Sequence, residues 1–98
     1  MTIHHLVCLS FDRLPEGEEF TALRARFKEL IGGIPGVESA NIGVNIRPDS
    51  RGQYNLAASI RFRDRAALEA FGPHPNHVAS GAMMSAYGLK AVSLDFED

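Results

Sequence analysis

The sequence is poor in cysteine and in long apolar runs, and each of these shortages excludes a class of protein. It has a single cysteine, Cys8, and no tryptophan among its 98 residues. One cysteine cannot form an internal disulfide, which excludes a disulfide scaffold and favours a reducing compartment. No apolar run approaches the roughly 20 residues of a transmembrane helix, and the first residues lack the charged and apolar regions of a signal peptide. We therefore expect a cytoplasmic protein with no membrane partner.

Excess charge of either sign is also absent. The chain has 10 basic and 12 acidic residues, which gives a formal net charge of −2, and no run of like charge. Nucleic acids and anionic membranes are bound by basic patches, so neither is an expected partner. No repeat, linker or low-complexity segment divides the chain, so residues 1–98 are predicted to form a single domain. A domain of this size buries only about 60–65% of its unfolded surface, which favours support from an oligomeric partner.

The chain begins with the alternating pattern of a strand. Over residues 3–11, His5 and Val7 share one face while the opposite face carries Leu6 and Cys8. Both faces are largely apolar, which predicts helices on one side of the sheet and a different cover, such as a second subunit, on the other. In such a strand Cys8 is expected to be a small core residue. His5 is expected to be a buried histidine held by a hydrogen bond.

Three helices and three further strands are predicted after this strand. The first helix starts near Pro15, ends at Gly32 and has one apolar stripe. Asp64 is a good N-cap for a short helix over residues 66–71, and a third helix is expected over residues 76–86. The other strands are expected over residues 37–46, 54–62 and 89–96, with a turn at 47–52. The order β-α-β-β-α-β, with its second helix split, predicts an α+β, ferredoxin-like antiparallel sheet with helices on one face.

The sheet face away from the helices is predicted to be apolar. It is expected to carry Leu6, Cys8, Ala40, Ile42, Val92 and Leu94. An exposed apolar surface of this extent needs a cover. Two such sheets packed face to face would cover each other, which predicts a homodimer.

The most unusual stretch is residues 71–77, Phe-Gly-Pro-His-Pro-Asn-His. Two prolines and a glycine interrupt the helical pattern, and Pro75 biases His74 away from helix. A new helix is predicted to start near Asn76, a favoured N-cap residue, which places His77 in its first turn. The unpaired amides of a first turn favour a neutral imidazole, and a neutral imidazole can act as a base.

Three interpretations of these histidines are open. In an enzyme, His77 takes a proton from an activated carbon or hydroxyl of a carbonyl compound, and His5 orients the compound or binds an oxygen. In a binding or stability protein without turnover, His74 and His77 are helix-start residues bonded to the backbone. A metal site needs a further ligand beside these histidines, and no cysteine pair or acidic cluster adjoins the stretch. A haem site would need one of these histidines as an axial ligand, and nothing else in the sequence indicates one. No cofactor is therefore expected.

A set of short segments resembles the stress-responsive dimeric α/β-barrel (Dabb) family over nearly the whole chain. The segments are Ile3-His4-His5-Leu6-Val7, Ile34-Pro35-Gly36-Val37, Gly43-Val44-Asn45, the strand of Tyr54, His74-Pro75-Asn76-His77 and Asp95-Phe96. The resemblance implies ferredoxin-like monomers whose sheets close face to face into a dimeric α/β barrel. It extends to the olivetolic acid cyclase-like members, which close a ring by aldol condensation without a cofactor.

The resemblance also implies roles for individual residues. It places the catalytic histidine of the cyclase-like members at His77 and a pocket histidine at His5. It places their tyrosine that pairs with the catalytic histidine at Phe71, a second pocket tyrosine at Phe27 and another histidine at Leu56. Phenylalanine neither donates nor accepts a proton, so the histidine–tyrosine arrangement is incomplete.

What remains is a mostly apolar pocket between the helices and the sheet, which suits a small hydrophobic or aromatic carbonyl compound. The residues predicted to form it are His5, Val7, Leu9, Leu23, Phe27, Ala58, Ile60, Phe71 and His77. The activity stays unassigned. Ligand binding is the first hypothesis, and a cofactor-free, polyketide cyclase-like reaction with His77 as general base is the alternative.

Overall fold

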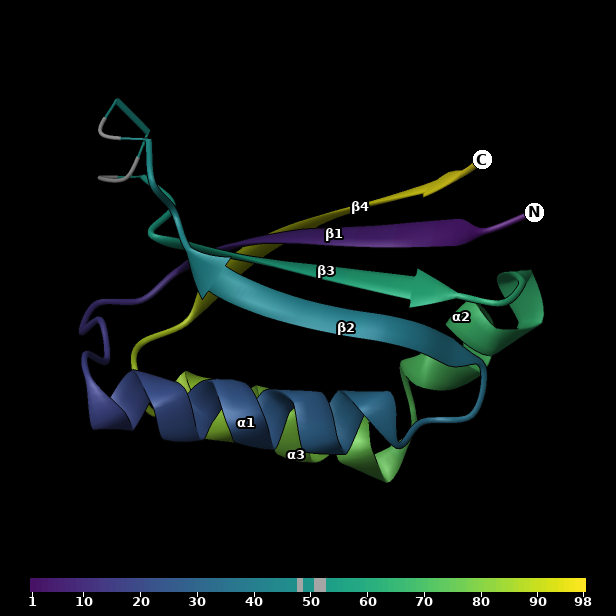
Figure 1. The fold of residues 1–98 in the computed structure, drawn as a ribbon, viewed down its shortest axis with the longest axis horizontal. Helices are drawn as coiled ribbons and strands as arrows, with labels where there is room; N and C mark the ends of the chain where they lie inside the picture. Colours follow the sequence, from purple (N-terminus) through teal and green to yellow (C-terminus); the bar gives the residue numbers. More distant parts are fainter. Residues whose placement is uncertain (48, 51–52) are drawn as a thin grey trace.

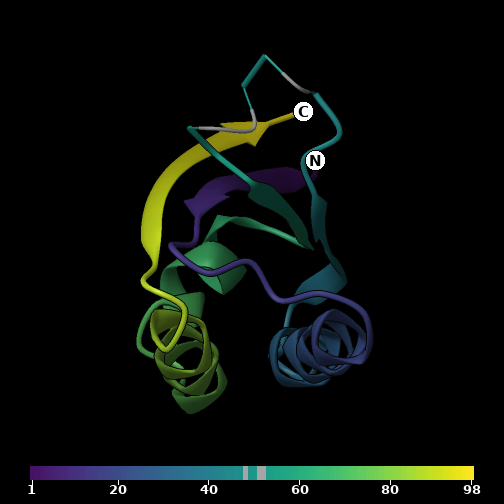
Figure 2. The ribbon, with the colours of Figure 1, turned by 90° about the vertical axis from the view of Figure 1, so that its left-hand side faces the viewer.

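The computed structural model describes residues 1–47, 49–50 and 53–98. Its elements are β1 (Ile3–Ser10), α1 (Glu18–Gly32), β2 (Val37–Val44), β3 (Leu56–Phe62), α2 (Arg65–Phe71), α3 (Pro75–Ser85) and β4 (Lys90–Glu97). The strands form one antiparallel sheet in the order β2-β3-β1-β4. Figure 1 and Figure 2 show the helices on one side of this sheet and the other face open. The predicted ferredoxin-like α+β fold is confirmed.

Two further predictions concern the turn after β2 and the absence of a transmembrane helix. The predicted turn at 47–52 lies partly outside the described residues. Within the described ranges, no helix has the length and apolar character that crossing a membrane requires.

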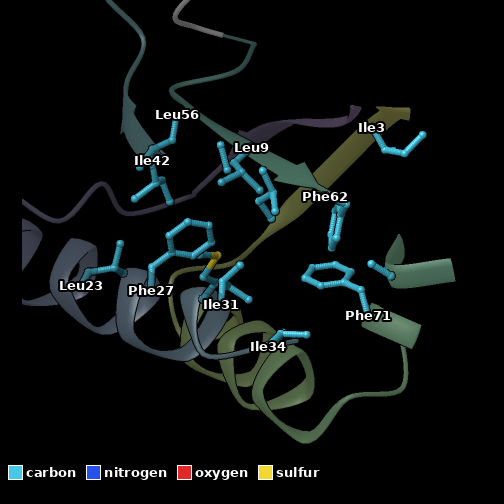
Figure 3. Packing of buried hydrophobic residues seen from close by; sticks show 14 of the residues in the cluster. Ile3, Leu9, Leu23, Phe27, Ile31, Ile34, Ile42, Leu56, Phe62 and Phe71 are labelled. Atoms are coloured by element: carbon cyan, nitrogen blue, oxygen red, sulfur yellow. The ribbon is translucent and has the colours of Figure 1, made fainter. Parts of the chain in front are cut away.

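The helix α1 forms because its sequence suits both its start and its buried face. Glu18 and Glu19 lie in its first turn, where carboxylates interact favourably with the positive end of the helix dipole. Leu23, Phe27 and Ile31 then recur at helical spacing, and all three are buried. Figure 3 shows these side chains directed from α1 toward the sheet.

The core lies between the helices and the central strands. In β3 the residues alternate strictly, so Leu56, Ala58, Ile60 and Phe62 are buried and the residues between them are not. The Phe62 ring is fully buried and meets Phe71 of α2 edge-on, with 5.0 Å between ring centroids (Figure 3). Burying a large apolar side chain contributes about 1.5–3 kcal/mol, so β3 is a main source of stability.

The register of β2 corrects one prediction. Ala40 and Ile42 are predicted on the open face, but both pack toward the helices, and Ile42 is buried in the core. The reason is a β-bulge between Val37 and Ser39, where β2 has one residue more than β3. One added residue moves each later side chain to the opposite face. The apolar residues of the open face therefore include Leu6, Cys8, Ala57, Val92, Leu94 and Phe96.

The environment of Cys8 also differs from the prediction. Cys8 is exposed and lies beside Val92 of β4 on the open face, so it is not a core residue of the single chain. It lies in the largely apolar strand β1, on the face that no element of the described chain covers. Burial of Cys8 therefore requires a second molecule on this face.

The proline-containing break joins α2 to α3. The predicted N-cap, Asn76, is wrong: His74 is the N-cap, and its Nδ1 accepts a hydrogen bond from the Asn76 backbone N–H at 3.0 Å. Pro75 is the first helical residue, where its missing N–H would have no partner in any case. The Asn76 side chain instead donates to the Leu30 carbonyl oxygen of α1 at 2.8 Å, which ties the start of α3 to the end of α1.

Candidate functional site

A cavity of about 510 Å³ lies between the helices and the sheet. Residues of β1, β3 and β4 form one wall, and residues of all three helices form the other. Every residue of β4 is exposed, so the cavity is open along this strand. Its volume is within the range of small-molecule sites.

The cavity contains eight of the nine predicted pocket residues. They are His5, Val7, Leu9, Phe27, Ala58, Ile60, Phe71 and His77. The ninth, Leu23, is buried in the core but does not line the cavity. The reason is its position on α1: the helix reaches the cavity with Phe27 and Ile31, which lie further toward its end.

His5 is held by a partner on the neighbouring strand. The β1–β4 register places His5 opposite Asp95, and the His5 Nδ1–H donates to the Asp95 carboxylate. The His5 side chain is 14% exposed and that of Asp95 is 42% exposed. A carboxylate only accepts hydrogen bonds, so this contact holds a proton on Nδ1 and leaves Nε2 as the free ring nitrogen. The predicted hydrogen bond of His5 is thus present, with an acid as its partner, but the residue is partly rather than fully buried.

His77 belongs to the opposite wall. It lies in the first turn of α3, as predicted, and is partly buried. Its Nδ1–H donates to the backbone carbonyl oxygen of Gly72 at 2.8 Å, within the break between α2 and α3. Because a carbonyl oxygen only accepts, the proton lies on Nδ1, and Nε2 is again the free nitrogen. In both histidines of the cavity wall, Nδ1 is therefore engaged by an oxygen acceptor and Nε2 is the free nitrogen.

The Phe71 ring lies close to both imidazoles. Its ring centroid is 5.6 Å from that of His5 and 4.3 Å from that of His77, and the residue is buried. A phenyl ring has no hydrogen-bond donor or acceptor of ordinary strength. The ring that contacts both histidines is thus apolar, and each histidine has its own hydrogen-bond partner elsewhere.

Sequence reasoning missed four polar residues of the cavity wall, Asp95, Ser93, Glu69 and Ser80. Asp95 and Ser93 lie on the same face of β4, and strict alternation from the strand's apolar residues could have assigned them to the helix side. Glu69 and Ser80 lie on short helices without a strong apolar stripe, so no pattern in the sequence separates them from surface residues. Among the described residues, no lysine or arginine lines the cavity.

The described part of the chain has no group of three histidine, cysteine, aspartate or glutamate side chains that could hold a metal ion. His74 and His77, the pair considered as metal ligands, each use Nδ1 in a bond to the backbone of the break. The local function visible for His74 is to cap α3.

Comparison with known proteins gives one family and a set of similar folds. The family model described as the stress responsive A/B barrel domain (Dabb) matches residues 3–98. The curated proteins give no match. A dimeric ferredoxin-like protein of unknown function from Thermobifida fusca is 18% identical, with a TM-score of 0.80 over 100% of this chain and 92% of that chain.

Two similar structures belong to enzymes with different activities. SnoaB, a cofactor-independent oxygenase from Streptomyces nogalater, is 14% identical, with a TM-score of 0.75 over 99% of this chain and 92% of that chain. A hydroxynitrile lyase from Passiflora edulis is 15% identical, with a TM-score of 0.76 over 97% and 91% of the two chains. At these identities the likeness shows the fold alone, and one fold carries both activities.

Proposed function

Because this chain belongs to the stress responsive A/B barrel domain (Dabb) family, we propose that it binds a small, uncharged, hydrophobic or aromatic carbonyl compound in the cavity between sheet and helices. The observation that carries the proposal is the pair of imidazoles, His5 and His77, each held through Nδ1 on the wall of a largely apolar cavity. Apolar walls with a few oriented polar groups are what recognition of such a compound requires.

The charges on the cavity wall support an uncharged ligand. Asp95 and Glu69 are acidic, and among the described lining residues there is no lysine or arginine to pair with an anion. A ligand carboxylate or phosphate would therefore meet two like charges in a partly desolvated site, which is unfavourable. A neutral ketone, aldehyde or ester avoids this cost.

The second candidate function is a cofactor-free, polyketide cyclase-like reaction, and the oriented histidines favour it. With Nδ1–H engaged, the His77 Nε2 can take a proton from the ligand carbon next to the carbonyl group. The Gly72 carbonyl would keep the resulting imidazolium in place. His5 would contact the ligand with an imidazole that the Asp95 carboxylate fixes, and it has no free N–H for the ligand's carbonyl oxygen. Phe71 leaves this site without the tyrosine that the cyclase-like members use.

We further propose that two copies pair through the open face to close an α/β barrel. Val92, Leu94 and Phe96 are 54%, 60% and 44% exposed on this face, which is a large apolar surface for a single chain. The structurally similar protein from Thermobifida fusca is described as dimeric. Cys8 on the same face has no cysteine to pair with in its own chain, which fits the reducing cytoplasm.

Gly81 offers a direct test of ligand binding in the cavity. It lines the cavity from α3, and apart from its chain neighbours and the nearby backbone of its own helix, no described atom comes within 4 Å of a Cβ placed on it. Gly81→Leu should therefore occupy part of the cavity, while Gly81→Ala leaves most of the space and raises stability by about 0.5–1 kcal/mol through helix propensity.

The measurement is thermal unfolding with a panel of neutral aryl ketones of increasing size, starting from acetophenone. A ligand present at 100 times its dissociation constant should stabilise the wild type and Gly81→Ala by about 2.7 kcal/mol. Gly81→Leu should fold but show no stabilisation. An equal response of all three proteins would place binding outside the cavity, and no response from any of them would refute the ligand class.

Two further measurements test the predicted charge of the ligand and the proposed reaction. 4-Methylacetophenone should bind, and 4-acetylbenzoate, which differs by a carboxylate, should not. Exchange of the acetophenone methyl protons in D₂O, followed by NMR, reports proton removal next to the carbonyl group. A wild-type acceleration that disappears in His77→Gln, with binding retained, supports the second candidate; wild-type binding without acceleration leaves the binding function alone.

A further inference from the structure

Ser80 is the buried polar residue of the described chain that the proposed function leaves unused. It is 3% exposed and lines the cavity from α3. We propose that the Ser80 hydroxyl donates the hydrogen bond that holds the ligand's carbonyl oxygen. This inference rests on the proposed function, because it assigns a role within the same cavity.

A second serine of the same helix shows what is unusual about Ser80. The Ser85 hydroxyl donates to the Gly81 carbonyl oxygen at 2.8 Å, which is the ordinary back-bond of a serine in a helix. The Ser80 hydroxyl makes no such bond to any described residue. Among the described residues, no side-chain oxygen or nitrogen that is sealed from solvent lacks a partner. The Ser80 hydroxyl is therefore not sealed from solvent, and Ser80 is one of the residues that line the cavity.

The cavity needs a donor of this kind. A carbonyl oxygen only accepts hydrogen bonds, while His5 and His77 already use their Nδ1–H groups on Asp95 and Gly72. In a neutral imidazole with Nδ1–H engaged, Nε2 accepts a hydrogen bond and donates none. Buried hydroxyls normally have a partner, and a ligand oxygen would provide it for Ser80.

The position of Ser80 fits this role. It follows His77 by three residues, and side chains three apart on a helix are neighbours, with about 5–6 Å between Cβ atoms. A carbonyl oxygen bound to Ser80 would thus bring the adjacent carbon toward the His77 Nε2. Ser93, the other serine of the cavity wall, is exposed on β4 and far less enclosed.

The test compares two ligands and three proteins. Acetophenone and ethylbenzene differ only in that a methylene group replaces the carbonyl group, and their dissociation constants are measured by NMR titration for wild type, Ser80→Ala and Ser93→Ala. Ser80→Ala should weaken acetophenone about fivefold, the loss expected for one hydrogen bond, and leave ethylbenzene unchanged. Ser93→Ala should change neither. The unliganded Ser80→Ala protein should unfold at no lower temperature than wild type, since no bond within the chain is lost.

Each other result overturns the inference. Equal weakening of both ligands in Ser80→Ala would mean that Ser80 only shapes the cavity, and unchanged acetophenone binding would mean that it is not the donor. Loss of selectivity in Ser93→Ala would assign the role to that serine. If the wild type binds neither acetophenone nor ethylbenzene, the proposed function fails, and the inference fails with it.

Discussion

The strands β3 and β4 flank β1 in the same sheet, yet their environments are opposite. Alternate residues of β3 are buried beneath the helices, whereas every residue of β4 is exposed and its extensive contacts are with β1 alone. Figure 2 shows β4 curving along the outside of the molecule. The strand β3 therefore stabilises the core, whereas the two sides of β4 can each contact a different partner.

The two sides of β4 correspond to two proposed contacts. The helix-facing side carries Ala91, Ser93 and Asp95, which line the cavity. The open side carries apolar residues, among them Leu94 and Phe96. An edge strand that stays exposed in the single chain can therefore serve a ligand on one side and a second copy on the other.

The largest effect should come from a core truncation in β3 set against the same truncation in β4. Phe62→Ala removes a ring that is 0% exposed and should cost about 3–5 kcal/mol in free energy of unfolding. Phe96, 44% exposed and stacked on His4, should cost less than half as much when changed to alanine. Urea unfolding of both variants in a Leu94→Asp background removes any contribution from pairing. Equal losses would show that the two strands do not differ as described.

The next effect should appear in the assembly. Leu94→Asp places a charge on the open face, which must be desolvated when two copies pair, so pairing should weaken at least about a hundredfold. Sedimentation velocity should then report a monomer where the wild type is a dimer. The control is Ser93→Asp, which puts the same charge on the cavity side of β4 and should leave the dimer intact. A wild-type monomer at all concentrations would contradict the pairing proposal.

The smallest effect concerns the residues that hold the segment leading into β4. The Arg13 guanidinium donates two hydrogen bonds to the Glu19 carboxylate, at 2.8 and 3.1 Å, and lies 4.7 Å from the centroid of the Tyr87 ring. The hydrogen bonding from Arg13 lowers the pKa of Glu19 below its ordinary value. Both side chains are exposed, so the contribution to stability is small.

The pH dependence of this contribution has a definite sign. A carboxyl whose pKa is lower in the folded state stabilises the protein above its unfolded pKa and loses this effect as the pH falls through the folded pKa. Arg13→Ala should therefore lower the melting temperature slightly at neutral pH, and the difference from wild type should close in acid. Lys28→Ala, an exposed change on α1, is the control. A difference that persists in acid would mean that the Tyr87 contact, not the ion pair, carries it.

Much of the fold follows from periodicity. Alternation located β1 and β3, and the helical stripe located α1, because each element buries one face against a common core. The face of Ala40 and Ile42 could not be predicted in the same way. A single extra residue in β2 reverses the alternation, and its effect depends on pairing with β3, which β2's own sequence does not encode.

The candidate site was predictable in its histidines and less so in their partners. His5 and His77 stand out because an imidazole is unusual on an apolar strand face and in a proline-rich break. Asp95 is 90 residues from His5 in sequence, and only the β1–β4 register brings the two together. Ser80 carries no mark in the sequence, since its burial comes from how α3 packs.

The strand β4 lies at the edge of the sheet and is paired in the sheet with β1 alone, which affects how fast a ligand can enter and leave the cavity. A strand that is bonded along one side and covered by no helix can fray in a local opening, which needs less free energy than unfolding the core. Such an opening would widen the cavity while α1, α3 and the central strands stay in place. Ligand exchange can then proceed far faster than global unfolding, and amide hydrogen exchange should be quicker in β4 than in β3.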